Sequence, residues 1–182
     1  MESKEKQIED HIRSVLELLG EDTTREGLLE TPRRVASMWL ELTEGNRSFP
    51  PEMTSFDRGQ NDQMITLFNV DFSSSCEHHM VTFNGKAHIG YIPDKRIVGL
   101  SKLARVVEWF ARRLQIQERM TAEIADFLMA RIEPQGVIVL IEAHHLCMSM
   151  RGIKKPNHTT VTSAIRGQLD KSEFFDLYKA LS

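Results

Sequence analysis

The chain has 182 residues, of which 41% are hydrophobic and 27% are charged. This length predicts one domain of ordinary size, and this composition excludes the disordered, collagen-like and low-complexity classes. The 23 basic and 26 acidic residues leave a net charge of -3, which gives no general attraction to nucleic acid or to anionic membranes. Any anion that the protein binds must therefore meet a local group of basic side chains.

The sequence begins with the charged stretch MESKEKQIEDHIR, which lacks the apolar core of a signal peptide. No later stretch has the roughly 18 consecutive apolar residues of a membrane-spanning helix, so we expect a cytoplasmic protein. Its two cysteines are Cys76 and Cys147. Because a reducing compartment disfavours structural disulfides, a metal site with thiolate ligands is the stronger reading of this pair.

Apolar spacing predicts two helices followed by a connector in the first third of the chain. The expected elements are a helix over 8–19 ended by Gly20, a second helix from an N-cap at Thr31 with Pro32 behind it to Leu42, and a connector over 45–63. We therefore divide one domain, 1–182, into an N-terminal helical segment, 1–63, and a core, 64–182.

From Met64 onward the pattern alternates as in β-strands, with Thr66, Phe68, Val70 and Phe72 on one parity. Asn84-Gly85 stands between two alternating segments, 80–83 and 86–92. Since both residues tolerate positive φ, this dipeptide predicts a tight hairpin turn.

The remaining pattern predicts two helices, two strands and a last helix. In order these are a helix capped by Ser101, a helix over 120–132, a strand over 137–143 that is apolar on both parities except at Glu142, a strand over 159–165 and a helix capped by Ser172. The predicted class is α+β, with N-terminal helices, a ββααββ unit and a final helix.

The sequence Cys76-Glu77-His78-His79 is the densest group of reactive side chains. Sulfur and imidazole are the ligands that zinc prefers, and a three-residue offset in a turn allows Cys76 and His79 to meet one ion. A second segment must complete the site. Cys147 offers the third ligand, and on an extended chain it shares a face with His145, Ser149 and Arg151.

Three protein ligands leave one tetrahedral position for water, as in catalytic zinc sites, and this pattern indicates hydrolysis. His78 and His145 are then candidates for proton transfer beside that water. The alternative for each residue taken singly is structural, because free cysteine is among the most buried residue types. A purely structural zinc site would need a fourth protein ligand, for example His78 or His145.

Two further groups suit a nucleotide. Ser101, Lys102 and Arg105 lie at a predicted helix start, where backbone N–H groups and two cations favour phosphate. From spacing alone, however, a solvated polar face is the favoured explanation of these residues. Gln117 and Glu118 open the next helix. A carboxylate and an amide suit the N–H edge of guanine, whereas an acidic residue at a helix start is also ordinary.

These motifs together resemble GTP cyclohydrolase I. The resemblance rests on Ser75-Cys76-Glu77-His78-His79, Gly99-Leu100-Ser101-Lys102-Leu103-Ala104-Arg105, Gln117-Glu118-Arg119 and His145-x-Cys147-x-x-x-Arg151-Gly152, with an N-terminal match around Glu26-Gly27-Leu28 and Thr31 to Val35. The sequence departs from the family at Leu114, where many members have proline, and at Ser37, where bacterial members often have lysine.

The resemblance implies the tunnelling fold, assembled by strand pairing into a ring that is a toroidal homodecamer in bacterial members, with active sites at subunit interfaces. It also implies the site residues. These are Cys76, His79 and Cys147 as zinc ligands, His78 and His145 at the reacting purine, Glu118 and Gln117 at guanine, and Lys102, Arg105, Arg151 and Arg34 at the triphosphate with Ser101 nearby.

The implied reaction converts GTP and water to 7,8-dihydroneopterin triphosphate and formate, the first step of pterin and tetrahydrofolate synthesis. Zinc makes hydroxide available for C8 of the purine, and His145 is the better candidate to deliver a proton to the ring nitrogen while His78 assists ring opening. The reverse assignment of these two roles stays open. The alternative function is a non-catalytic tunnelling-fold protein that only binds guanine nucleotides. A zinc nucleobase deaminase is disfavoured, because its His-x-Glu and Pro-Cys-x-x-Cys motifs are absent from the sequence.

Overall fold

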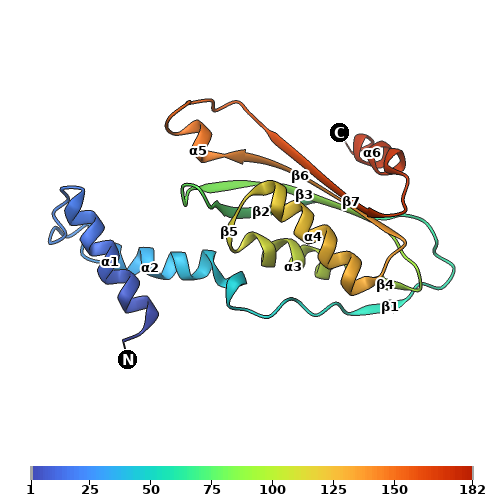
Figure 1. The fold of residues 1–182 in the computed structure, drawn as a ribbon, viewed down its shortest axis with the longest axis horizontal. Helices are drawn as coiled ribbons and strands as arrows, with labels where there is room; N and C mark the ends of the chain where they lie inside the picture. The colour runs from blue at the N-terminus through green and yellow to red at the C-terminus, as the bar shows by residue number, and fades with distance from the viewer. Residues whose placement is uncertain (1, 182) are drawn as a thin grey trace.

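A five-stranded sheet forms the centre of the protein, for which a computed structural model describes residues 2–181 (Figure 1). The strand order is β5-β2-β3-β6-β7, and all neighbours are antiparallel except β5 with β2. The strands are β2 (Ile65–Cys76), β3 (Thr82–Ile92), β5 (Leu114–Gln115), β6 (Gly136–His145) and β7 (Thr160–Gly167). A separate two-stranded sheet pairs β1 (Ser55–Asp57) with β4 (Arg96–Val98).

The helices follow one another along the chain in the predicted order. They are α1 (Lys4–Leu18), α2 (Thr31–Leu42), the short 3-10 helix η1 (Glu44–Asn46), α3 (Leu100–Ala111), α4 (Gln117–Ile132), α5 (Leu146–Ser149) and α6 (Lys171–Lys179). The α+β class and the ββααββ order are thereby confirmed, with β4, β5 and α5 as short additions. Figure 1 shows α1 and α2 extending away from the sheet. None of the helices in the described part of the chain is long and apolar enough to cross a membrane.

Both faces of the sheet are covered near β6. On one face, α3 and α4 supply a continuous apolar core, in which Leu103, Val106 and Ile124 are fully buried. On the other face, α6 packs Phe174 against Ile138 and Leu140. This explains why the β6 sequence is apolar on both parities, and it confirms that prediction.

The predicted hairpin turn at Asn84-Gly85 is wrong, because β3 runs straight through this dipeptide. The turn lies earlier, at 77–81, where Met80 has a φ of 54° and the Cys76 N–H donates to the Val81 carbonyl over 2.9 Å. Gly85 has a packing role instead. A Cβ on Gly85 would lie 1.9 Å from the Glu142 carbonyl oxygen, so glycine allows β6 to approach closely.

Helix starts differ by one or two residues from the predicted caps. The residues in the N-cap positions are Glu30, Gly99 and Asp170, in place of Thr31, Ser101 and Ser172. The Asp170 carboxylate accepts from the Ser172 N–H over 2.8 Å. This is an ordinary N-cap hydrogen bond, but the capping side chain is Asp170 and Ser172 supplies the backbone donor. The predicted connector also contains β1, which ties the N-terminal segment to the core through β4.

Among residues 2–181, two long strands of the five-stranded sheet, β2 and β7, have outer edges that are largely or wholly unpaired. Strand β7 pairs only with β6, and the outer edge of β2 pairs with β5 only at Ser75 and Cys76. The backbone groups along most of β2 and all of the outer side of β7 are therefore available for strand pairing.

Candidate functional site

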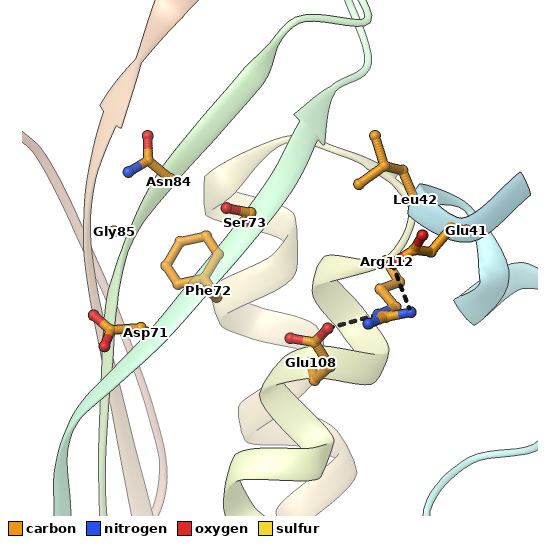
Figure 2. Close-up of a pocket in the computed structure, with 9 residues that line it drawn as sticks. All are labelled: Glu41, Leu42, Asp71, Phe72, Ser73, Asn84, Gly85, Glu108 and Arg112. Atoms are coloured by element: carbon orange, nitrogen blue, oxygen red, sulfur yellow. Dashed lines mark hydrogen bonds and ion pairs between the residues drawn. The ribbon is translucent and has the colours of Figure 1, made fainter. Parts of the chain in front are cut away.

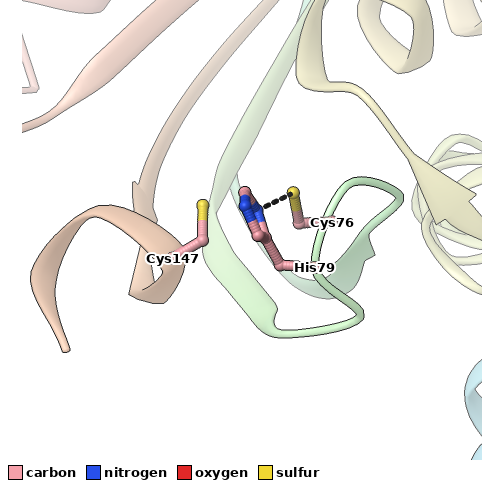
Figure 3. A group of neighbouring side chains, drawn as sticks. All are labelled: Cys76, His79 and Cys147. Atoms are coloured by element: carbon pink, nitrogen blue, oxygen red, sulfur yellow. Dashed lines mark hydrogen bonds between the residues drawn. The ribbon is translucent and has the colours of Figure 1, made fainter. Parts of the chain in front are cut away.

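Three metal-ligating side chains converge at one end of the sheet (Figure 3). Cys76 is the last residue of β2, His79 lies in the turn to β3, and Cys147 lies in α5. Their ligand atoms all lie within 4.8 Å of one another, and Cys76 Sγ is 3.7 Å from His79 Nδ1. The turn is closed by the Cys76 carbonyl, which accepts from the Met80 N–H over 2.8 Å.

This donor set fits zinc. Zinc–sulfur and zinc–nitrogen bonds of about 2.3 and 2.0 Å at tetrahedral angles place sulfur and nitrogen about 3.6 Å apart, close to the 3.7 Å between Cys76 and His79. Burial, and then the neighbouring Cys76 sulfur, raise the pKa of Cys147. Burial lowers the pKa of His79. A neutral imidazole beside two crowded sulfurs is a favourable environment for a divalent cation.

The cluster opens into a cavity of about 320 Å³. Seven of the predicted site residues line it: Cys76, His78, His79, Gln117, Glu118, His145 and Cys147. Gln115, Ile116, Met148 and Thr160 complete the wall. The structure therefore brings the predicted metal ligands, both predicted acid/base histidines and the predicted guanine-binding pair into one pocket.

His145 is held on several sides at the end of β6. Its ring stacks on Phe83 with centroids 4.7 Å apart and an interplanar angle of 4°. Its Nε2 lies 2.8 Å from Gln117 Oε1, and its backbone N–H donates to His158 Nε2 over 3.3 Å. Burial, assisted by the nearby His158, lowers the pKa of His145, and the Glu118 carboxylate acts in the opposite direction.

The prediction of an extended strand through Cys147 is wrong. Strand β6 ends at His145, and the chain then forms the single helical turn α5. This turn directs the Cys147 thiol toward Cys76 and His79, as Figure 3 shows. His144 is on the opposite strand parity, as predicted, and its Nδ1 is 3.1 Å from the His158 carbonyl oxygen.

Glu77 and Arg119 fix the turn that carries His79, a contact that the sequence analysis did not identify. Arg119 on α4 forms an ion pair with the Glu77 carboxylate, which lowers the pKa of Glu77. The Arg119 Nε also donates to Gln115 Oε1 over 3.1 Å, and Gln115 Nε2 donates to Glu123 over 2.9 Å. Both charges stand in the recognised motifs, but their 42-residue separation gave no signal that they meet.

The predicted phosphate-binding residues do not line the metal pocket. Arg105 borders a different cavity of about 360 Å³, beside Trp109 and Phe49. Arg34 is exposed on α2, and Ser101 and Lys102 lie in the first turn of α3. Of the predicted cations, only Arg151 acts electrostatically on the cluster, since its charge contributes to lowering the pKa of both His79 and Cys147.

Another cavity, of about 560 Å³, lies away from the cluster between α2, α3 and the β2–β3 pair (Figure 2). There Arg112 of α3 donates to Glu108 over 2.6 Å and lies 4.0 Å from Glu41 of α2. Glu44 of η1 joins the same guanidinium at 3.0 Å. This group joins the end of α2 and η1 to α3 and contains none of the predicted site residues.

The fold and the pocket together define an α+β enzyme with a metal site, in which two thiols and an imidazole converge beside further histidines and a carboxylate. A family model described as GTP cyclohydrolase I matches residues 8–178. The chain belongs to the GTP cyclohydrolase I family.

Relatives match over nearly the whole chain. The GTP cyclohydrolase 1 of Wolinella succinogenes is 53% identical over 169 residues, which cover 92% of this chain and 90% of that protein. The GTP cyclohydrolase 1 of Aquifex aeolicus is 53% identical over 184 residues, covering 98% of both. That of Mycolicibacterium vanbaalenii is 54% identical over 161 residues, covering 86% of this chain and 79% of that protein.

Proposed function

We propose that this protein hydrolyses the imidazole ring of GTP and rearranges the product to 7,8-dihydroneopterin triphosphate, with release of formate. Family membership supports the reaction. The observation that carries it is a Cys76, His79 and Cys147 cluster that opens into the same cavity as His78 and His145. Metal ligands and proton-transfer groups thus face one volume, as a metal-assisted hydrolysis requires.

In this proposal Cys76, His79 and Cys147 hold one zinc ion. When bound, zinc supplies a water of lowered pKa as the nucleophile for C8 of the purine. In the described part of the chain no fourth cysteine, histidine or carboxylate joins the cluster. A three-ligand set with an open cavity beside it favours a catalytic rather than a structural metal.

The two histidines move protons. His145 donates to the ring nitrogen next to C8, which makes that carbon electrophilic, and His78 assists proton transfer as the ring opens and formate leaves. Both line the cavity, and His78 is exposed toward it.

Glu118 accepts the N–H edge of guanine. It is an exposed carboxylate on the cavity wall, and a carboxylate pairs with two adjacent N–H donors. The contact of Gln117 with guanine stays a prediction, since its side-chain amide already has hydrogen-bond partners within the protein.

The triphosphate is bound by Lys102, Arg105, Arg151 and Arg34, with Ser101 nearby, and part of this set comes from a neighbouring copy. The basic residues of α3 lie outside the cavity of their own chain. The unpaired edges of β2 and β7 offer a way to bring the copies together. Pairing β7 of one copy with β2 of the next extends the sheet into the ring of the tunnelling fold, and two such rings form a homodecamer.

Two further statements stay predictions. The whole chain, 1–182, acts as one domain, with 1–63 as its N-terminal segment. The protein works in the cytoplasm and supplies pterin or tetrahydrofolate synthesis.

Incubation with GTP and zinc, followed by mass analysis of the nucleotide and assay of formate, tests the proposal. We expect formate and dihydroneopterin triphosphate in equal amounts. Unchanged GTP, recovered from zinc-loaded protein that binds it in calorimetry, would instead establish the non-catalytic alternative.

A further inference from the structure

The side chain of Gln117 is 1% exposed, and both ends of its amide have partners in the protein. Its Nε2 lies 3.0 Å from the Ile141 carbonyl oxygen, 3.0 Å from the Thr160 carbonyl oxygen and 3.1 Å from Thr162 Oγ1. Backbone carbonyl oxygens can only accept, so the amide nitrogen must face them. The orientation of the amide is thereby fixed, with Oε1 directed to His145.

This orientation determines which ring nitrogen of His145 carries the proton. An amide oxygen has no proton to give, so His145 Nε2, 2.8 Å away, must be the donor. A neutral His145 is therefore protonated on Nε2. Its Nδ1 is then free to accept a proton, and in the imidazolium form the Nδ1 proton is the one that passes to the substrate while Nε2–H stays bonded to Gln117.

Two threonines extend the same hydrogen-bond chain. Thr121 Oγ1 lies 2.7 Å from the Gln117 carbonyl oxygen and must donate to it. Because its single proton is used there, Thr121 accepts from Thr162 Oγ1 at 2.7 Å. The Thr162 hydroxyl thus has a lone pair directed to Gln117 Nε2, whose two N–H groups are shared among this oxygen and the two backbone carbonyl oxygens. Every bond in the chain runs in a defined direction, and such chains strengthen their members.

We propose that Gln117, supported by Thr162 and Thr121, is a positioning residue that fixes His145 as the Nε2–H tautomer and reserves Nδ1 for proton exchange with the substrate. This inference rests on the proposed function. It assigns Gln117 a role other than guanine binding and adds Thr121 and Thr162, which lie on α4 and β7, to the groups on which proton transfer depends.

The first test separates positioning from substrate binding. Gln117→Met keeps the length of the side chain and removes both hydrogen-bonding ends. We expect kcat to fall about 10²- to 10⁴-fold, the usual contribution of a placed acid/base group, with KM and zinc content nearly unchanged. A rise in KM at unchanged kcat would instead place Gln117 on the substrate and overturn the proposal.

The second test changes Thr162, a residue that does not line the metal pocket. Thr162→Val keeps the shape and removes the hydroxyl, whereas Thr162→Ser keeps the hydroxyl. Loss of one hydrogen bond in the chain predicts a kcat about 3- to 10-fold lower for Thr162→Val, and activity near that of the unchanged protein for Thr162→Ser. Equal kcat values for the two variants, at equal folding and zinc content, would contradict the proposal.

The third test does not depend on activity. Solid-state ¹⁵N spectra of zinc-loaded, histidine-labelled protein at about pH 8, where a free imidazole is neutral, report the tautomer of each ring, and a His145→Asn sample identifies the signal of His145. We expect the Nε2–H form in the unchanged protein and in Thr162→Ser, and a mixture in Thr162→Val. An Nδ1–H form in the unchanged protein disproves the inference even if GTP is hydrolysed. Absence of formate with the expected tautomer would refute only the proposed function.

Discussion

The metal pocket and the basic residues of α3 differ in how far one chain assembles them. The pocket collects its side chains from several strands and helices of one chain, and the ligand atoms of Cys76, His79 and Cys147 lie within 4.8 Å of one another. The contributing elements are β2 and the turn after it, β5, α4, β6, α5 and β7. Ser101, Lys102 and Arg105 stand on α3 outside that pocket. A single copy thus brings the metal cluster and the histidines together, whereas it leaves these α3 residues outside the same pocket.

The largest effect on activity is expected from a substitution that removes a metal ligand from the pocket. Cys147→Ala removes one of three ligands, so we expect zinc to be lost and formate release to fall by more than about 100-fold, the upper range for losing only an outer partner of a ligand. Metal analysis and a formate assay check this. Met150→Leu, at an exposed position after α5, is the matched control and should retain zinc. Full zinc retention by Cys147→Ala would remove Cys147 from the ligand set.

The next effect tests whether the two regions come from different copies. Arg105→Ala should lower kcat/KM about 10- to 100-fold, because a charge-assisted hydrogen bond to phosphate is lost. Arg131→Ala, an exposed change on α4, should have little effect.

Co-expression of Arg105→Ala with Cys147→Ala sharpens the comparison. If each site takes its zinc ligands from one copy and Arg105 from the next, random mixing leaves roughly a quarter of the sites intact, and activity returns to about that fraction. No recovery in mixed oligomers would show that both groups act from the same chain.

A smaller effect concerns the turn between the two ligands Cys76 and His79. Arg119→Ala removes the partner of Glu77, and because this pair is partly exposed, its contribution is about 1 kcal/mol or less. We expect zinc affinity to weaken by no more than about 5-fold, as measured by competition with a chelator. Arg112→Ala, which loosens the N-terminal helices instead, should leave zinc affinity unchanged.

The smallest effect on activity is expected from changing His88, which lies outside both the metal pocket and the basic residues of α3. The prediction for this residue therefore concerns the pH dependence of stability. His88 is fully buried beneath α6, and its Nε2 has no hydrogen-bond partner in the described structure. The titratable groups that face it are Glu142, Lys86 and Tyr178. Burial lowers the pKa of His88, although Glu142 opposes this. Below about pH 6.5 the unfolded chain therefore binds a proton that the folded chain resists, and stability falls by at most about 1.4 kcal/mol per pH unit.

Thermal unfolding at several pH values checks the His88 prediction. His88→Gln should flatten the loss of Tm between about pH 7 and pH 5, the range below the unfolded pKa of histidine. An unchanged slope would mean that other groups, such as the carboxylates of the surface, cause the acid sensitivity.

Much of the fold follows from sequence periodicity, and the exceptions have physical reasons. The apolar faces of α3 and α4 are buried, as their spacing in the sequence predicted. Strand β6 is apolar on both faces and is covered on both, which was also predicted. Asn84-Gly85 was misread because a glycine that permits a turn also permits close strand packing, and only the position of Glu142 on β6 distinguishes the two.

The sequence predicted that Cys76, His79 and Cys147 come together, but not how the chain brings them together. The three-residue offset of Cys76 and His79 is local, so the sequence contained it. The placement of Cys147 by a helical turn, and the pairing of Glu77 with Arg119, depend on contacts between segments far apart in the chain. The hydrogen-bond chain through Thr121 and Thr162 has no sequence signal, because threonine in helices and strands is ordinary.

The open edges of β2 and β7 carry a risk during synthesis. A newly made copy exposes backbone donors and acceptors that can pair with any extended peptide. Under the proposed assembly, pairing with the correct neighbour therefore competes with misassembly. Dilution slows any encounter between copies, so it also prolongs the time for which these strand edges stay exposed.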